Sequence, residues 1–277
     1  MQSASPPWSR PIFRWAGSKK GILDHLRRCV PPVYGRYIEP FAGSACLFFA
    51  LNPAKAILAD FNSELMHAYG VLAKHPRLVI RMVSGLPDDA SDYYAIRDLN
   101  PEKLPDLERA ARFVYLNRFC FNGVYRTDRH NRFNVPRGTR AGRPLVEAEV
   151  VRCSVALRRA ELLTDDFELT LGQARRDDFV YVDPPYTSAV RQTYGEYGYG
   201  AFSSNDVRRL HSRLEYLTKV GVKVLLSYSA DRELLRLLED WSVVILPVRR
   251  RIAGGSRSHE THEILASNYT DLRPMAH

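Results

Sequence analysis

The sequence predicts an α/β fold with a Rossmann-like sheet and helices on both faces. Residues 37–60 carry a strand, a small-residue turn, a helix and a second strand that ends in an acid, which resembles a nucleotide-binding half-fold. Residues 179–182 form a short apolar run, the pattern of a buried strand, which stops at Asp-Pro-Pro-Tyr. Ligands of open α/β sheets bind beyond the carboxyl ends of the strands, so a ligand is expected at this corner.

The corner at residues 183–186 is predicted to be rigid. Its two prolines fix φ, lack N–H groups and favour an extended conformation in the residues before them. The corner therefore presents the Asp183 carboxylate, a free backbone carbonyl and the ring of Tyr186. A capping aspartate in front of a simple proline turn is the alternative interpretation.

Length and composition limit the class of protein. The 277 residues, 45% of them hydrophobic, suffice for one large or two modest domains. No apolar run is long enough to span a membrane, and residues 1–11 lack the apolar segment of a signal peptide, so a cytoplasmic protein is expected. Four scattered cysteines without metal-ligand spacing predict free thiols and no metal site. The net charge of +9 suggests a polyanionic partner, usually nucleic acid.

The first half-fold can be followed residue by residue. A loop over residues 13–20 precedes a helical pattern that ends at the prolines of positions 31 and 32. Gly43 lies in the turn after the strand at residue 37, and a backbone without a side chain there can approach a ligand. Asp60 ends the next strand and can bind ribose hydroxyls; its alternative role is to cap the helix that follows.

Residues 74–162 are predicted to be inserted, because they exceed what one crossover helix requires. Helical patterns cover residues 78–83, 93–99 and 108–117. Residues 117–126 and 132–138 then alternate around a polar turn and contain Asn-Gly, which indicates a β-hairpin with an arginine-rich rim. Such a hairpin can enter a DNA major groove, or it can be a solvated charged surface.

The remaining elements complete the sheet. Strands are predicted at residues 160–164 and 223–227, and helices at 204–217 and 231–238. The segment 188–201, rich in tyrosine and glycine, is either a mobile lid with stacking rings or an irregular surface loop. Residues 241–247 and 263–266 are expected to form a closing antiparallel pair.

The motifs occur in a recognisable order. Phe-Arg-Trp-Ala-Gly-Ser-Lys and Glu-Pro-Phe-Ala-Gly-Ser precede Ala-Asp-Phe-Asn, and Asn-Arg-x-x-x-Asn-Gly-x-x-Arg with Phe-Asn-Val-Pro follows. Asp-Pro-Pro-Tyr and Glu-Ile-Leu-Ala-Ser-Asn-Tyr come last. From about residue 12 to residue 269, the chain resembles the bacterial and phage DNA adenine N6-methyltransferases that include the GATC-marking enzymes. The chain departs from that family at Ala45, where the family usually has glycine.

The resemblance implies a function and a set of roles. The enzyme would use S-adenosylmethionine to methylate N6 of a flipped adenine in duplex DNA, with GATC the leading site. Residues 1–73 and 163–277 would form the catalytic domain, and residues 74–162 the DNA target-recognition domain. A monomer without an obligate protein partner is expected; a role in restriction-modification is left open.

The same resemblance assigns individual residues. The expected catalytic residues are Asp183, Pro184, Pro185 and Tyr186. The expected cofactor-binding residues are Trp15, Lys19, Ala42, Gly43, Asp60, Asp166, Phe167 and Asp183. The expected DNA-binding residues are Asn122, Arg126, Arg129, Arg132, Asn134, Pro136 and Arg137, of which Arg126 would contact a guanine.

Two alternatives remain at this point. The first keeps the fold but acts on adenine in RNA or on the N4 amine of cytosine, although cytosine enzymes more often carry serine in place of Asp183. The second is a DNA-binding regulator that keeps the fold without catalysis, against which the intact Asp-Pro-Pro-Tyr corner argues.

Overall fold

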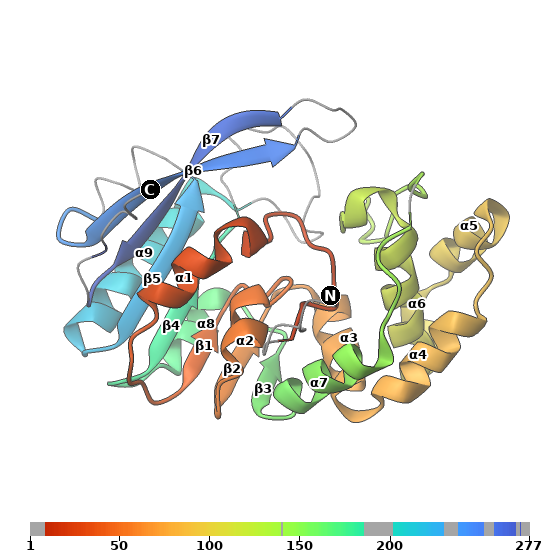
Figure 1. The fold of residues 1–277 in the computed structure, drawn as a ribbon, viewed down its shortest axis with the longest axis horizontal. Coiled ribbons are helices and arrows are strands. Elements are labelled where there is room, and N and C mark those ends of the chain that lie inside the picture. Colours follow the sequence, from red (N-terminus) through yellow and green to blue (C-terminus); the bar gives the residue numbers. More distant parts are fainter. Residues whose placement is uncertain are drawn as a thin grey trace, which may run out of the picture.

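The computed structural model describes residues 9–139, 141–185, 202–229, 238–251, 258–269 and 272. Within these residues the chain forms a mixed α/β fold around a seven-stranded sheet (Figure 1). The expectations for residues 186–201 and 231–237 lie outside the described part of the chain; they include Tyr186, the segment 188–201 and most of the helix at 231–238. None of the described helices has the length and apolar character needed to cross a membrane.

The sheet has the strand order β3-β2-β1-β4-β5-β7-β6. The five strands from β3 to β5 are parallel, and β7 pairs antiparallel with both β5 and β6. The strand order reverses between β1 and β4, and such a switch point is where open α/β sheets bind ligands. The strands are β1 Tyr37–Glu39, β2 Ala56–Ala59, β3 Ala160–Leu163, β4 Phe179–Val182, β5 Lys223–Ser229, β6 Ser242–Arg251 and β7 Ser258–Ser267.

Helices cover both faces of the sheet, as predicted. On β1, Tyr37 packs into a core shared with α1, α2 and α3, whereas the next residue, Ile38, packs against α8 and α9. This alternation follows from the period of two along a strand. The helices are α1 Leu23–Cys29, α2 Cys46–Leu51, α3 Ser63–Lys74, α4 Pro76–Gly85, α5 Ala90–Asp98, α6 Asp106–Phe119, α7 Glu147–Leu157, α8 Phe167–Gly172 and α9 Ser204–Lys219.

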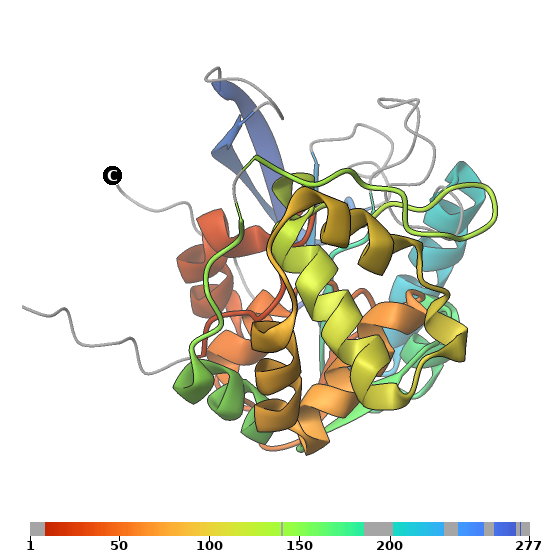
Figure 2. The ribbon, with the colours of Figure 1, turned by 90° about the vertical axis from the view of Figure 1, so that its right-hand side faces the viewer.

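The three helices expected between residues 78 and 117 are present as α4, α5 and α6. Figure 2 faces these helices and shows the chain after α6 running back across them toward α7. Buried residues of α4, α6 and α7 belong to the same hydrophobic cluster as one face of the sheet. The domain boundaries at residues 74 and 162 stay a prediction.

The predicted β-hairpin is wrong as a regular ladder. Residues 117–119 belong to α6, and a short 3-10 turn, Phe121–Gly123, follows. The two sides pair as two isolated antiparallel bridges, Cys120 with Arg137 and Thr127 with Phe133, and not as a continuous ladder. The Asn-Gly pair adopts positive φ, yet it closes that 3-10 turn, and the chain reverses at the polar turn around Asp128. We call residues 120–138 the arm.

Candidate active site

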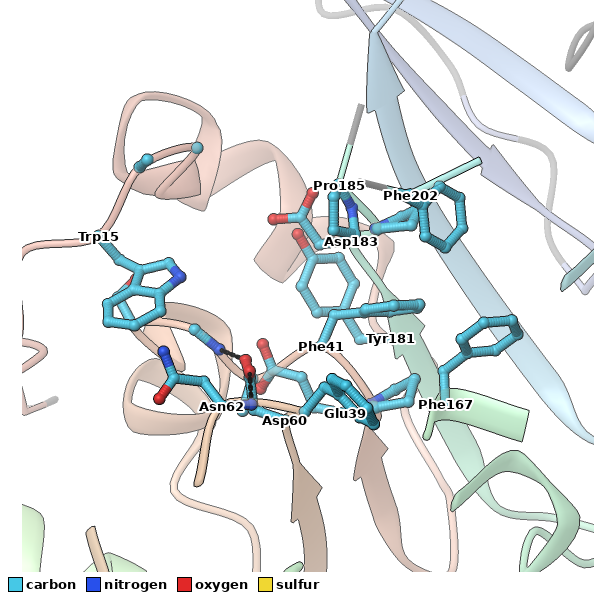
Figure 3. A pocket seen from close by; sticks show the side chains of 18 of the residues that line it. Trp15, Glu39, Phe41, Asp60, Asn62, Phe167, Tyr181, Asp183, Pro185 and Phe202 are labelled. Carbon is cyan, nitrogen blue, oxygen red and sulfur yellow. Dashed lines mark hydrogen bonds between the residues drawn. The ribbon is translucent and has the colours of Figure 1, made fainter. Parts of the chain in front are cut away.

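A cavity of about 260 Å³ lies where β1, β2 and β4 end. Its lining comes from segments far apart in the sequence, including residues 15–19, 39–46, 60–62, 165–167 and 181–185 (Figure 3). All eight residues expected to bind the cofactor line it, together with Pro184 and Pro185 of the expected catalytic corner. The structure therefore brings together sequence signals that were separated by up to 168 positions, from Trp15 to Asp183.

The turn after β1 is built around Gly43. Its φ is +46°, in the left-handed region that favours glycine, and a Cβ there would lie 2.7 Å from Cδ1 of Trp15. The Gly43 N–H donates to Oδ2 of Asp60 at 2.9 Å, and its carbonyl accepts from the Tyr69 hydroxyl at 2.8 Å. The turn is thus fixed from both sides and exposes bare backbone to the cavity.

Asp60 stabilises this turn and does not cap α3. Its Oδ1 accepts from the N–H of Asn62 at 2.9 Å, and Asn62 itself is the cap, with Oδ1 accepting from Leu65 N. Desolvation raises the pKa of Asp60, and the N–H groups of Asn62 and Gly43 oppose that rise. The helix-cap alternative for Asp60 is therefore wrong.

Lys19 joins two acids at the edge of the cavity. Its Nζ lies 2.6 Å from Asp183 Oδ1 and 2.9 Å from Glu263 Oε1. Lys19 and Glu263 are only 5% and 1% exposed, and Asp183 Oδ1 also accepts from the Ser227 hydroxyl at 3.2 Å. Desolvation raises the pKa of Asp183, Lys19 acts against this rise, and Glu263 adds to it. A buried lysine between two carboxylates satisfies charges that would be costly alone.

Glu39 is a further acid in the cavity that sequence reasoning missed. It ends β1, is 2% exposed, and accepts from the Tyr37 hydroxyl at 2.8 Å through Oε2. Desolvation raises the pKa of Glu39 well above its usual range, and Asp183 and Asp60 add to the effect. The sequence offered a signal for Glu39, because it is the one acid of a buried strand, β1.

Aromatic rings form the wall opposite Trp15 (Figure 3). The rings of Phe41 and Phe167 stack with centroids 5.3 Å apart, and Phe202 meets both at 5.9 Å. Asp166 caps α8 by accepting from Glu168 N at 2.9 Å, which places Phe167 at the first position of that helix. Arg209 holds this corner, since it donates to Asp166 Oδ1 at 2.7 Å and lies over the Phe167 ring. Phe41 and Phe202 were not anticipated.

The expected DNA-binding residues lie along the arm. Arg126 donates through Nε to Asn134 Oδ1 at 2.8 Å, a bond that ties the two sides of the arm together. Arg132 lies at the exposed turn, where its Nε is 3.2 Å from Asp128 Oδ2. Arg137 instead binds Asp88 at the loop between α4 and α5, with Nη2 2.8 Å from Oδ1. Three further arm residues, Asn122, Arg129 and Pro136, are exposed.

A family described as D12 class N6 adenine-specific DNA methyltransferase matches residues 15–252. The chain belongs to this family. The match confirms the resemblance carried by the sequence motifs, and it spans the described parts of the cavity from Trp15 to Phe202 and the whole arm.

Three related proteins are themselves named as methyltransferases or methylases. A type II methyltransferase of Lactococcus lactis subsp. cremoris, M1.LlaDCHI, is 33% identical over 94% of this chain and 95% of its own length. The retron Ec67 DNA adenine methylase of Escherichia coli is 32% identical over 82% of this chain and 79% of its own. The DNA adenine methylase of Haemophilus influenzae is 34% identical over 66% of each chain.

One ring pair connects the arm of this methyltransferase-family chain to its cavity. Tyr125 of the arm stacks on Trp15, with centroids 5.7 Å apart and an angle of 21° between the planes. Trp15 in turn lies against the Gly43 turn. The arm and the turn after β1 therefore share one aromatic contact.

Proposed function

We propose that this chain transfers the methyl group of S-adenosylmethionine to N6 of an adenine flipped out of duplex DNA. The observation that supports it most strongly is the position of Asp183 at the end of β4. There Asp183 faces the same cavity as the Gly43 turn and Asp60. A carboxylate beside a nucleotide-type turn joins an acceptor for an amine to a cofactor site.

The charges of the cavity suit this cofactor. Asp60 and Asp183 line it, and Lys19 is ion-paired with Asp183. S-adenosylmethionine carries a sulfonium and an ammonium group, so an acidic cavity favours it by Coulomb attraction. Asp60 would hold the ribose hydroxyls, because a carboxylate keeps acceptor capacity after two hydrogen bonds.

Other lining residues would hold the two ends of the cofactor. Asp166 and Phe167 would frame its adenine, with Phe41 stacked beside Phe167. Ala42 and Gly43 would pass beneath it, and Trp15 and Lys19 would lie near its methionine end.

When bound, the cofactor supplies an activated methyl group on a positive sulfur. The protein aims the nucleophile: the Asp183 carboxylate and the Pro184 carbonyl would accept the two N–H bonds of the exocyclic amine. These acceptors stabilise the positive charge that develops on nitrogen. Lys19 and Ser227 fix the orientation of Asp183, and Lys19 favours its ionised form. Pro185 stiffens the corner, and Tyr186 would stack on the flipped base.

The arm would recognise the duplex. Arg126 is the proposed contact to a guanine beside the target adenine, with GATC as the proposed site. Arg129, Arg132 and Arg137 would contact phosphates, and Asn122, Asn134 and Pro136 would shape the surface between them. Residues 74–162 would then act as the target-recognition domain of a monomeric enzyme.

Transfer of a tritiated methyl group tests the proposal directly. The purified protein is incubated with labelled S-adenosylmethionine and either duplex DNA, RNA or free nucleosides, and the labelled base is identified. We expect the label in N6-methyladenine of duplex DNA. When the protein is expressed in a methylation-deficient host, sequencing of the host DNA should show methylated adenine at one recognition site. Asp183→Ala should lower the rate by at least about 10²–10³ while the fold persists. Label in RNA or on cytosine N4, or no label at all, would contradict the proposal.

A further inference from the structure

A second cavity of about 500 Å³ lies beside the first, and its mainly apolar lining carries five basic side chains. It is bounded by residues 10–14, the end of α6, residues 142–146 and the start of α7. Its only acid is Glu149, which forms an ion pair with Arg143. We call it the cation pocket; its basic side chains are Arg10, Arg14, Lys20, Arg118 and Arg143.

The N-terminal segment separates the cation pocket from the candidate active site. Trp15 and Lys19 line the active-site cavity, while their direct neighbours Arg14 and Lys20 line the cation pocket. The pocket also adjoins the base of the arm, because Gly138 N donates to Phe119 O at 2.8 Å and Gly142 lies against Arg118. The pocket therefore lies next to both proposed contact regions of the duplex, the arm and the active-site cavity.

Arg14 forms part of the wall of the cation pocket and is held there by hydrogen bonds within the protein. Its guanidinium donates to the carbonyls of Asn117, Arg118 and Cys120 at the end of α6, at 2.7, 2.8 and 3.0 Å through Nη2. A Cβ at Gly142 would lie 3.0 Å from Arg14 Nε, so the chain there packs directly on the guanidinium. Arg14 is therefore committed to the protein and shapes the pocket.

Arg143 is paired with Glu149, whereas Arg10, Lys20 and Arg118 form no ion pair within the described part of the chain. Arg10 and Lys20 are exposed at the pocket, and the described part of the chain offers Arg118 Nε no hydrogen-bond partner although it is buried. The pKa of Lys20 is lowered chiefly by desolvation, and the guanidiniums of Arg143, Arg10 and Arg14 lower it further. Crowded like charges raise the energy of the free protein, and a bound anion relieves it.

We propose that the cation pocket binds a backbone phosphate of the duplex, held by Arg10, Lys20 and Arg118. This inference rests on the proposed action on duplex DNA. A phosphodiester is an anion with acceptor oxygens that guanidinium groups bind with two parallel N–H bonds. Phosphate contacts fix position on the duplex and carry no base information, so the pocket would hold register while the arm recognises sequence.

The salt dependence of binding tests the pocket. Fluorescence anisotropy measures the dissociation constant of a labelled duplex for the parent chain, Arg10→Ala, Lys20→Ala and the double variant, across a range of salt concentrations. Each lost contact should make the plot of log K against log salt concentration less steep by about 0.9. It should also weaken binding roughly fivefold near 150 mM salt, equally for all sequences. Lys55→Ala is the matched control, because Lys55 is exposed just before β2, at the opposite end of the strands.

The outcomes separate this inference from the proposed function. A smaller slope for both single variants, with Lys55→Ala unchanged, supports the pocket. An unchanged slope overturns the pocket even when the parent methylates duplex DNA, whereas a parent that methylates no DNA overturns the proposed function. Titration calorimetry with inorganic phosphate covers the other source of this anion. One outcome is that Lys20→Ala abolishes phosphate binding but leaves the salt dependence of duplex binding unchanged. That result would assign the pocket to a free anion and refute the proposal.

Discussion

Lys19 Nζ lies 2.6 Å from Asp183 Oδ1, although the two residues come from opposite halves of the chain. The same nitrogen contacts Glu263 of β7, so one buried cation serves two acids. The charge state of Asp183 therefore depends on two neighbours with opposite effects. Lys19 lowers the pKa that desolvation has raised, and Glu263 raises it.

Removal of Lys19 and removal of Glu263 should shift the acid limb of the pH–rate profile in opposite directions. The proposed mechanism requires ionised Asp183, and its pKa is raised, so activity should fall at a higher pH than for an ordinary aspartate. Lys19→Gln removes the cation and should move the limb to higher pH, whereas Glu263→Gln removes the acid and should move it to lower pH. Turnover measured against pH at saturating cofactor and DNA checks this, with Lys55→Gln as the control. Shifts of both variants in the same direction would refute it.

Asp60→Ala should weaken S-adenosylmethionine binding more than it slows saturated turnover, because contacts to ribose hydroxyls act mainly through binding. The loss also leaves the N–H groups of Gly43 and Asn62 without their acceptor, which should cost about 1–3 kcal/mol of unfolding free energy. Calorimetry gives the affinity and urea denaturation the stability, with Asp89→Ala as a control that removes the cap of α5 outside the cavity. An unchanged cofactor affinity in Asp60→Ala would limit Asp60 to a structural role.

Gly43→Ala should destabilise the turn after β1 by roughly 1–3 kcal/mol, because φ of +46° disfavours a Cβ and that Cβ would strike Trp15. Trp15→Ala should relieve the collision but not the strained φ. The double variant is then less destabilised than the sum of the two single variants. Urea denaturation of the four proteins measures this difference. Simple additivity would show that Trp15 does not limit the space at this turn.

Arg126→Ala should relax selectivity at one base, with a loss of about 1–3 kcal/mol of discrimination. Asn134→Ala should have a weaker effect of the same kind, because Asn134 holds the Arg126 guanidinium. Arg132→Ala is the contrasting variant, since an exposed phosphate contact should weaken binding to all sequences alike. Methylation profiles on a randomised oligonucleotide library distinguish these effects. An unchanged site preference in Arg126→Ala would refute its assignment.

Sequence patterns predicted the strands more reliably than the irregular parts. Apolar runs with clear ends predicted five strands, and the structure has all of them; they begin at residues 37, 56, 160, 179 and 223. The closing pair β6 and β7 was also found, but it extends well beyond the expected residues 241–247 and 263–266. The helix α8 was missed because six residues hold too few turns to show a period.

The arm shows why irregular structure was harder to predict. Asn122 and Gly123 both adopt positive φ, as a tight hairpin turn requires, yet they lie in the 3-10 turn after α6, where Gly123 packs against Arg14. Glu263 escaped notice because its partner, Lys19, is distant in sequence. Ala45, where the family usually has glycine, has φ of 49°, so the departure costs backbone strain at the start of α2.

The pairing of β1 with β4 has a consequence for the order of folding during synthesis. Tyr37 pairs with Phe179, and the adjacent residues Arg36 and Asp178, joined by a hydrogen bond, are 142 positions apart. At about 5–20 residues per second, the edge of β1 stays unpaired for roughly 7–30 s after it leaves the ribosome. Glu263 is made later still, so a nascent chain has no complete charge triad around Lys19. The ion pairs around Lys19 are therefore completed only late in synthesis.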